Sequence, residues 1–311
     1  MVTVNPTASA GTGAFSRATS TDAMRVRARR RGTIGKVGVY IGIAAIVVYC
    51  LAPFYWMIVS SLRRTNDLFS SNILPAPLSL DGYRAAFASG NGFLKSLLNS
   101  LVVAGITTIV ALLIAIATAY ALARLQFRAK NIVMAIIIAT SMFPGITLVV
   151  PLFKLFTNIG WINTYQAMIV PDLSFILPLA VFNLTSFFRQ MPFELEESAK
   201  MDGCTPLQAF RRVILPLAAP GVFTTAIIVF TTAIIVFIGA WNEFIIATSM
   251  VNNKNKEVAT VIVSQFSGNS GYQVPFGAQM SAGVIVTIPL VIMVLLFQRR
   301  IVAALTAGGV K

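Results

Sequence analysis

Residues 189–216 read RQMPFELEESAKMDGCTPLQAFRRVILP and separate two long apolar runs. Within them, residues 193–201 are predicted to form a short helix whose early acidic residues are favoured by the positive end of the helix dipole. Gly203 is expected to end that helix in the left-handed conformation, which glycine adopts without steric cost. Thr205 suits the N-cap of a second short helix. The interval is therefore predicted to fold into two short helices at a bend, a compact knob that can fit a groove.

Acidic residues are concentrated in this interval, which holds four of the ten in the chain. Mixed charge at this density predicts a solvated surface. That surface is either a loop kept soluble by its charges or a site that meets a partner, and the residues alone leave both interpretations open. The small side chains of Ser198 and Ala199 are expected on its exposed face. The four acidic residues are Glu194, Glu196, Glu197 and Asp202.

The 311-residue chain around this interval is too apolar for a soluble protein. Hydrophobic residues make up 57% of it and charged residues 11%, and the mean hydropathy is +0.81. A bilayer core about 30 Å thick takes roughly 20 apolar residues per spanning helix. The sequence therefore predicts an all-α integral membrane protein with six transmembrane helices in a domain over residues 34–311. The expected spans lie at about residues 37–62, 96–123, 131–153, 165–188, 217–244 and 279–298.

Basic residues predict the orientation of these spans. Residues 1–33 are rich in Ser, Thr, Ala and Arg without apolar periodicity, which predicts a disordered basic tail. Seventeen of the 24 lysines and arginines lie in the alternate segments that include both ends of the chain and residues 189–216. Because such residues favour the cytoplasmic side, we expect the tail, both termini and the charged interval in the cytoplasm. Topology thus accounts for the net charge of +14, and no nucleic-acid partner is predicted.

Catalytic and metal-binding chemistry is not indicated by the sequence. The chain contains no histidine, which removes Ser-His and Cys-His nucleophilic catalysis and His-ligated metal sites. Cys50 and Cys204 have no metal-ligating neighbours, and no G-x-x-x-x-G-K-[ST] loop is present to hold nucleotide phosphates. We therefore predict no catalytic residue, metal site or cofactor in this chain, so that any ATP and Mg used for transport would be bound by another chain.

A heptad is repeated within the predicted fifth span. Residues 224–230 and 231–237 both read TTAIIVF. Seven residues make almost two helical turns and drift by only about 20°, so the copy lengthens a helix while keeping nearly the same face. Whether the added length is used by the protein is left open by the sequence.

Motifs in the charged interval and beyond it resemble a known family. Glu197-Ser198-Ala199, followed by Gly203 and by Val213-Ile214-Leu215-Pro216, resembles the EAA motif of permease subunits of binding-protein-dependent ABC importers, with Ser198 in place of the usual alanine. Further segments resemble the carbohydrate-importing branch of maltose/trehalose type. The chain is seven residues longer than that family between the motif and residue 241, which is the size of the heptad. The further segments are Phe143-Pro144-Gly145, Asn163-Thr164-Tyr165, Trp241-Asn242-Glu243-Phe244 and residues 305–311.

This resemblance, over roughly residues 40–311, implies the type I permease fold of ABC importers in a bacterial inner membrane, surrounded by lipid. The implied partners are a second homologous permease subunit, a dimer of ATPase subunits and an extracytoplasmic sugar-binding (lipo)protein. The implied function is to pass a disaccharide such as trehalose or maltose inward. A polyol or glycerol-phosphate importer of the same architecture is the alternative, followed by a membrane scaffold without transport.

The resemblance also assigns residues to ATPase contacts. A coupling helix in residues 189–216 would enter a cleft on the ATPase, and the terminal tail would reach the same subunits. The coupling residues would be Glu197, Ser198, Ala199, Asp202, Gly203, Leu215 and Pro216, and those of the tail Thr306, Gly308, Gly309 and Lys311.

Candidate substrate contacts lie within or beside the predicted spans, and candidate binding-protein contacts lie in a predicted external loop. Asp172 and Glu243 are acidic residues within predicted spans, where carboxylates usually face a cavity or a partner. Asn183 and Asn242 offer amides to sugar hydroxyls, and Trp241 offers a stacking ring, although tryptophan is also a common interface anchor. Sugar contact and a structural role stay open for all five. The glycine-rich loop with Asn269, Tyr272 and Gln273 is either a flexible hairpin or, as the resemblance implies, a probe of the binding protein.

Overall fold

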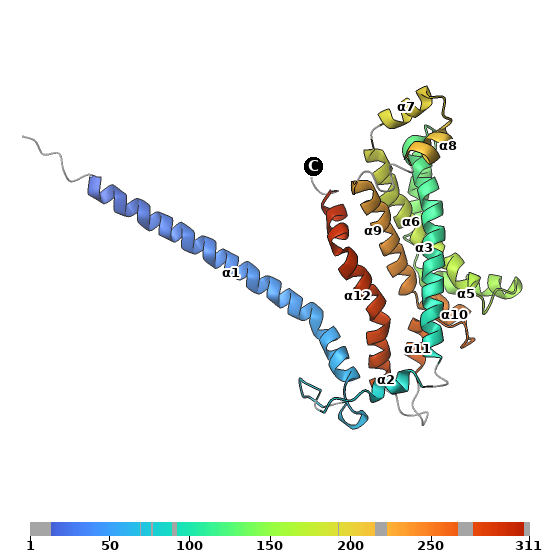
Figure 1. Cartoon of the computed structure of the whole chain (residues 1–311), viewed down its shortest axis with the longest axis horizontal. Coiled ribbons are helices and arrows are strands. Elements are labelled where there is room, and N and C mark those ends of the chain that lie inside the picture. The colour runs from blue at the N-terminus through green and yellow to red at the C-terminus, as the bar shows by residue number, and fades with distance from the viewer. Residues whose placement is uncertain are drawn as a thin grey trace, which may run out of the picture. The chain divides into compact units, whose positions relative to one another are not determined.

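Every regular element in the described part of the chain is a helix, which confirms the all-α prediction (Figure 1). The chain divides into two units, Met1–Met57 and Ile58–Lys311. The computed structural model describes residues 14–68, 70–75, 77–88, 92–191, 193–214, 223–266 and 276–307.

Helix α1 runs from Ala14 to Ser61. Its part from Val37 to Ser61 is long and apolar enough to cross a membrane, as predicted. Residues 14–33, in contrast, are helical where the sequence predicted no regular structure. This difference has a physical reason, since a helix already nucleated in an apolar span extends cheaply into a segment of alanine and arginine, both good helix formers.

Four long helices build the rest of the molecule: α3 (Phe93–Arg124), α6 (Gln166–Gln190), α9 (Phe223–Trp241) and α12 (Phe276–Ala307). Helix α3 packs against α6 and α9, and α12 packs against α9 (Figure 1). We call these four helices the bundle.

Alanines form the closest seam of the bundle. Ala111, Ala115 and Ala119 recur at every fourth position of α3, and each is 0% exposed. They pack in one cluster with Ala180 and Leu184 of α6. Small side chains at an interface between membrane helices let the two backbones approach closely.

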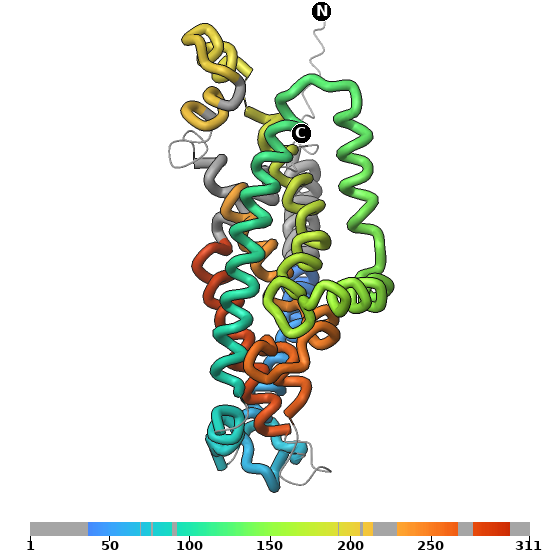
Figure 2. Tube along the Cα trace, turned by 90° about the vertical axis from the view of Figure 1, so that its right-hand side faces the viewer, coloured from blue at the N-terminus to red at the C-terminus, as the bar shows by residue number. Residues whose placement is uncertain are grey.

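The predicted third span is divided in the structure. Helices α4 (Lys130–Thr140) and α5 (Gly145–Asn158) meet at 90°, and Figure 2 shows α5 (light green) turning away from α4. Pro144 explains the break, because its ring removes a backbone donor and disfavours helical geometry at Phe143. The expectation of one continuous span at residues 131–153 is therefore wrong in its geometry.

The count of six spans stays a prediction. In the part of the chain that the structure describes, four helices are long and apolar enough to cross a membrane, or five if the bent α4–α5 pair is one span. Helix α9 covers most of the predicted fifth span, while residues 215–222 lie outside the described residues. The predicted span 279–298 falls inside the longer α12.

Both heptads lie in the continuous helix α9. Deleting residues 231–237 shortens that helix by about 10.5 Å, at 1.5 Å per residue. Identical residues then take the vacated positions, rotated by only about 20°, so we expect the variant to insert and to pack near Trp241 as before. Membrane insertion and trypsin resistance against the unaltered chain test this, and loss of either would show that the protein needs the added length.

Short elements lie at the two ends of the bundle (Figure 1). One end carries α7 (Glu194–Met201), α8 (Pro206–Ala209) and the π-helix η2 (Phe210–Ile214). The opposite end carries α2 (Asp81–Ala86) and α11 (Ala259–Gln265), with α10 (Ile245–Met250) beside α5 and α6. A 3₁₀ turn, η1, covers Thr65–Asp67.

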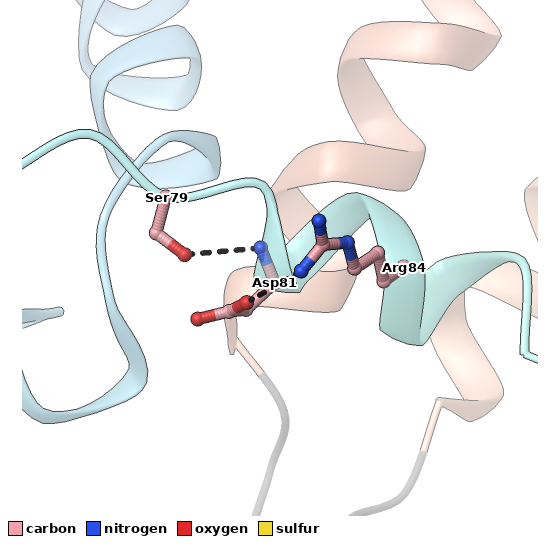
Figure 3. Close-up of polar contacts among 3 residues, drawn as sticks. All are labelled: Ser79, Asp81 and Arg84. Atoms are coloured by element: carbon pink, nitrogen blue, oxygen red, sulfur yellow. Dashed lines mark hydrogen bonds and ion pairs between the residues drawn. The ribbon is translucent and has the colours of Figure 1, made fainter.

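A local side-chain hydrogen bond shapes the turn that leads into helix α2. Ser79 Oγ accepts a hydrogen bond from the backbone N–H of Asp81 at 3.0 Å (Figure 3). The neighbouring Asp81–Arg84 ion pair is 3.8 Å long and largely exposed, so it contributes little to stability. What holds α2 in place is its close packing against α12 around Gly82 and Gly277.

Candidate functional site

The knob, defined here as residues 193–214, stands where α3 and α6 end (Figure 1). Its first helix, α7, has the predicted bounds to within one residue. Gly203 then takes a φ of +81°, the left-handed conformation that the sequence predicted. The N–H of Cys204 donates to the carbonyl of Ala199 and the N–H of Gly203 to that of Lys200, each at 2.9 Å. These two bonds form a Schellman motif, which fixes the direction of the chain after α7.

The second helix of the knob, α8, begins at Pro206 and is capped by Thr205, again as predicted. The N–H of Thr205 donates to Gln208 Oε1 at 2.8 Å, and the N–H of Gln208 donates to Thr205 Oγ1 at 3.3 Å. This reciprocal pair is a capping box, which satisfies two backbone donors at the start of α8. Both ends of the bend are thus fixed by hydrogen bonds, so the knob is a defined shape.

The exposed face of the knob carries most of the predicted motif residues. Glu197, Ser198, Asp202 and Gly203 are exposed. Ala199 is 3% exposed, which corrects the expectation that it lies on the surface. It falls on the face of α7 that packs inward, and its carbonyl is used by the Schellman motif.

Glu196 is a second correction, because it was expected to belong to a solvated acidic surface and is only 4% exposed. Its Oε1 lies 3.2 Å from Nε of Arg124, the last residue of α3. Arg124 Nη2 donates to the carbonyl of Met191 at 2.7 Å, and the guanidinium lies 4.4 Å from the centre of the Phe193 ring. The sequence showed Arg124 only as a charge at the end of a span. Its ion pair spans 72 positions, beyond the reach of local patterns.

Three candidate substrate residues have contacts within the protein. Trp241 is 3% exposed, and its Nε1 donates to the carbonyl of Val286 at 3.2 Å. The side chain of Asn242 is exposed and donates to the carbonyl of Ile238. The Glu243 carboxylate accepts from the first backbone N–H groups of α10, at 2.7 and 2.9 Å. Each residue thus has a structural role, and sugar contact stays a prediction.

Asp172 and Asn183 differ from these three. Asp172 is 2% exposed, and its Oδ1 has no hydrogen-bond partner among the described residues. Asn183 is half-buried and lies about three helical turns further along α6. A buried carboxylate oxygen without a partner is unusual in a folded protein, so Asp172 is the stronger of the two candidates for contact with another molecule.

Asn163 fixes a loop at the end of the bundle opposite the knob. Its φ is +62°, which asparagine tolerates better than most residues. Its Oδ1 accepts from the N–H groups of Asn252 and Asn253 at 2.8 and 3.0 Å, and its own N–H donates to Met250. The Asn-Thr-Tyr segment therefore holds the chain that follows α10.

A second asparagine holds the other side of the same loop. Asn99 of α3 donates to the carbonyls of Asn255 and Glu257 at 3.1 and 2.8 Å. Its Oδ1 accepts from the hydroxyl of Tyr165 at 2.9 Å. Residues 251–258 are thus bound both to α3 and to the turn before α6.

We expect Asn163→Gly to loosen this loop, because glycine keeps the positive φ but lacks the acceptor oxygen. Asn163→Asp keeps an acceptor and is the matched control. Each lost hydrogen bond is worth about 1 kcal/mol, so the amides of Asn252 and Asn253 should exchange hydrogen roughly tenfold faster or more in the glycine variant alone. Equal exchange in the two variants would contradict the assignment.

Comparison with known proteins identifies this architecture. The family described as "Binding-protein-dependent transport system inner membrane component" matches residues 109–306. This chain belongs to that family. It is a multi-pass membrane permease subunit, as the resemblance implied.

Relatives of this permease are named as subunits of transport systems. The trehalose transport system permease protein SugB of Mycobacterium tuberculosis is 42% identical over 266 residues, 86% of this chain and 94% of that protein. The trehalose/maltose transport system permease protein MalG of Thermococcus litoralis is 36% identical over 283 residues, 91% and 99% of the two chains. A chain in a crystal structure of a bacterial ABC transporter that imports alginate matches with a TM-score of 0.73 at 18% identity, covering 87% of this chain and 97% of that chain, and shows the shared fold.

Several predicted site residues of the permease lie outside the described residues or at their edge. Thr306 belongs to α12, without a described side chain. The residues outside are Leu215, Pro216, Asn269, Tyr272, Gln273, Gly308, Gly309 and Lys311.

Proposed function

We propose that this permease is a membrane subunit of an ATP-driven importer that passes a disaccharide of the trehalose or maltose kind from an extracytoplasmic binding protein to the cytoplasm. The observation that carries the proposal is the knob, whose exposed acidic face is held by a Schellman motif and a capping box. A membrane scaffold has no need of a rigid projection of this kind. The sugar is inferred from the names of two relatives that this chain matches over most of their length.

The proposed complex contains a second permease subunit, a dimer of ATPase subunits that bind ATP and Mg, and the binding protein, in a bacterial inner membrane. With both termini and the knob in the cytoplasm, the knob meets the ATPase. Closure of the ATPase dimer around ATP would move the knob as a rigid body and change the side to which the pathway opens. ATP then stabilises one state over the other, and hydrolysis resets the equilibrium.

Individual residues keep the roles that the resemblance assigns. Glu197, Ser198, Asp202 and Gly203 would contact the ATPase directly, since they are exposed. Ala199 would act from beneath, by packing the helix that carries them. The other proposed ATPase contacts are Leu215, Pro216, Thr306, Gly308, Gly309 and Lys311, and the loop residues proposed to meet the binding protein are Asn269, Tyr272 and Gln273.

Asp172 is the proposed sugar contact with the strongest support, because its buried Oδ1 lacks a partner in the described chain. A second permease subunit that seals the pathway would bring sugar hydroxyls to this oxygen. Asn183, Trp241, Asn242 and Glu243 are the remaining proposed contacts.

Uptake by the reconstituted complex tests the function. In liposomes with ATP inside and binding protein outside, we expect accumulation of radiolabelled trehalose or maltose and none of a polyol or glycerol-phosphate. A complex whose ATPase subunits cannot hydrolyse ATP is the control and should accumulate nothing. Uptake of only the polyol or glycerol-phosphate would overturn the sugar assignment. Uphill uptake by this chain alone would overturn the proposal that separate ATPase subunits drive transport.

A further inference from the structure

The contacts of Arg124 extend beyond capping the end of a span. Its side chain is 0% exposed, and three contacts surround the guanidinium: the Glu196 carboxylate of α7, the Met191 carbonyl after α6, and the Phe193 ring. One side chain of α3 therefore touches both the end of α6 and the start of the knob.

We infer that Arg124 is the positioning residue that locks the knob to α3, so that a movement of the knob is passed to the bundle. This inference rests on the proposed function. It adds to that function a side-chain connection between the surface that would meet the ATPase and α3, which is separated from the knob along the chain by α4, α5 and α6.

The chemistry of the pair favours positioning over bulk stabilisation. Arg124 Nε and Glu196 Oε1 are close, but neither has a hydrogen bond of good geometry, and Arg124 Nη1 also lacks a partner among the described residues. Burying two charges costs free energy that such incomplete satisfaction does not fully return, and apolar residues of similar size often stabilise as well or better. What the ion pair supplies is orientation, because the buried carboxylate of Glu196 reaches the guanidinium from the face of α7 that packs inward.

A second contact reinforces the first. Tyr120 lies one helical turn before Arg124 on α3, and its ring centre is 4.3 Å from that of Phe210 in η2 and 5.9 Å from that of Phe188 in α6. Helix α3 thus holds the knob at two places, its first helix through Arg124 and its last turn through Tyr120. A body held at two places on one helix cannot swing independently of that helix.

The path continues into the bundle without a break. Helix α3 packs along α6 through the alanine seam and also against α9. Displacement of its Arg124 end therefore acts on two other helices of the bundle. Coupling between the knob and the transport pathway requires packed helices with two discrete arrangements. A force applied at the knob would then favour one arrangement over the other.

The test compares coupling in complexes that assemble equally. Arg124→Gln removes the charge and keeps a polar side chain, and we expect the ratio of ATP hydrolysed to sugar imported to rise roughly tenfold, within the usual range of coupling between sites. Arg128→Gln is the matched control, since Arg128 is exposed four residues further on and should leave the ratio unchanged. Arg124→Lys keeps the charge but not the planar fork, so it should restore coupling only in part.

Glu196→Gln provides the second measurement, with exposed Glu194→Gln as its control on the same helix. A rise in the ratio for Glu196→Gln but not for Glu194→Gln supports the inference. Wild-type ratios in assembled Arg124→Gln or Glu196→Gln complexes, or equal changes in the controls, would overturn it. If neither variant assembles, Arg124 serves folding, which also overturns the inference. Failure of the unaltered complex to import sugar is a separate outcome that tells against the proposed function.

Discussion

A complex carrying Gly203→Pro should continue to hydrolyse ATP and import almost no sugar. The φ of Gly203 is +81°, whereas the proline ring fixes φ near about −65°. Proline also lacks the N–H that Gly203 donates to the Lys200 carbonyl, so the Schellman motif is lost. Helix α7 then leaves its angle to α8, and the knob no longer fits a cleft shaped for it. ATPase activity and sugar uptake, measured on the same liposomes, separate the two effects.

Gly203→Ala offers a milder version with a matched control. Gly160, in the turn after α5, has a φ of +73°, and neither glycine has an atom of the described chain within 4 Å of a built Cβ. Alanine at either position therefore costs about 1–2 kcal/mol of backbone strain and nothing in packing. We expect only Gly203→Ala to lower sugar uptake per ATP. A similar loss in Gly160→Ala would show that strain alone, and not the shape of the knob, impairs transport.

Gly82→Ala should destabilise the protein although alanine is the better helix former. A Cβ at Gly82 would lie 2.5 Å from Ser281 Oγ and 2.6 Å from the carbonyl oxygen of Gly277. No Cβ is tolerated at such distances, so α2 must move away from α12. Overpacking of this kind costs about 1–3 kcal/mol. The thermal unfolding temperature of the purified protein measures it and should fall.

Gly105→Ala is the control for this substitution, because it replaces another helical glycine, on α3, with nothing within 4 Å of its Cβ in the described chain. It should stabilise by about 0.5–1 kcal/mol, the usual gain over glycine within a helix. Adding Ser281→Ala to Gly82→Ala removes the hydroxyl but not the Gly277 carbonyl, so it should restore little. Full recovery in the double variant would show that the hydroxyl, not the backbone, sets the limit.

The parts of the site that the sequence predicted are those whose causes are local. Gly203 ends α7 and Thr205 caps α8 because glycine tolerates positive φ and a threonine hydroxyl can accept from a nearby backbone amide, and both partners lie within a few residues. The apolar spans were predicted for the same reason, since a run of about 20 apolar residues by itself indicates a transmembrane helix.

The parts that the sequence did not predict depend on distant residues. Glu196 looks like its acidic neighbours until α3 brings Arg124 to it, and Ala199 is buried only because α7 turns that face inward. Phe143-Pro144-Gly145 was noted as a family segment, yet an apolar run on both sides concealed the right angle at Pro144. Periodicity and composition describe one helix at a time, and these features arise between helices.

The alanines of α3 have a consequence for motion. Because these alanines are 0% exposed and pack in one cluster with Ala180 and Leu184, α3 and α6 fit closely and cannot slide past each other without opening the seam. Helices α3 and α6 should therefore move together as one rigid body. Any rocking of the permease would take place at seams with longer, more adaptable side chains, such as the one where Leu290 and Met293 of α12 meet Phe237 of α9.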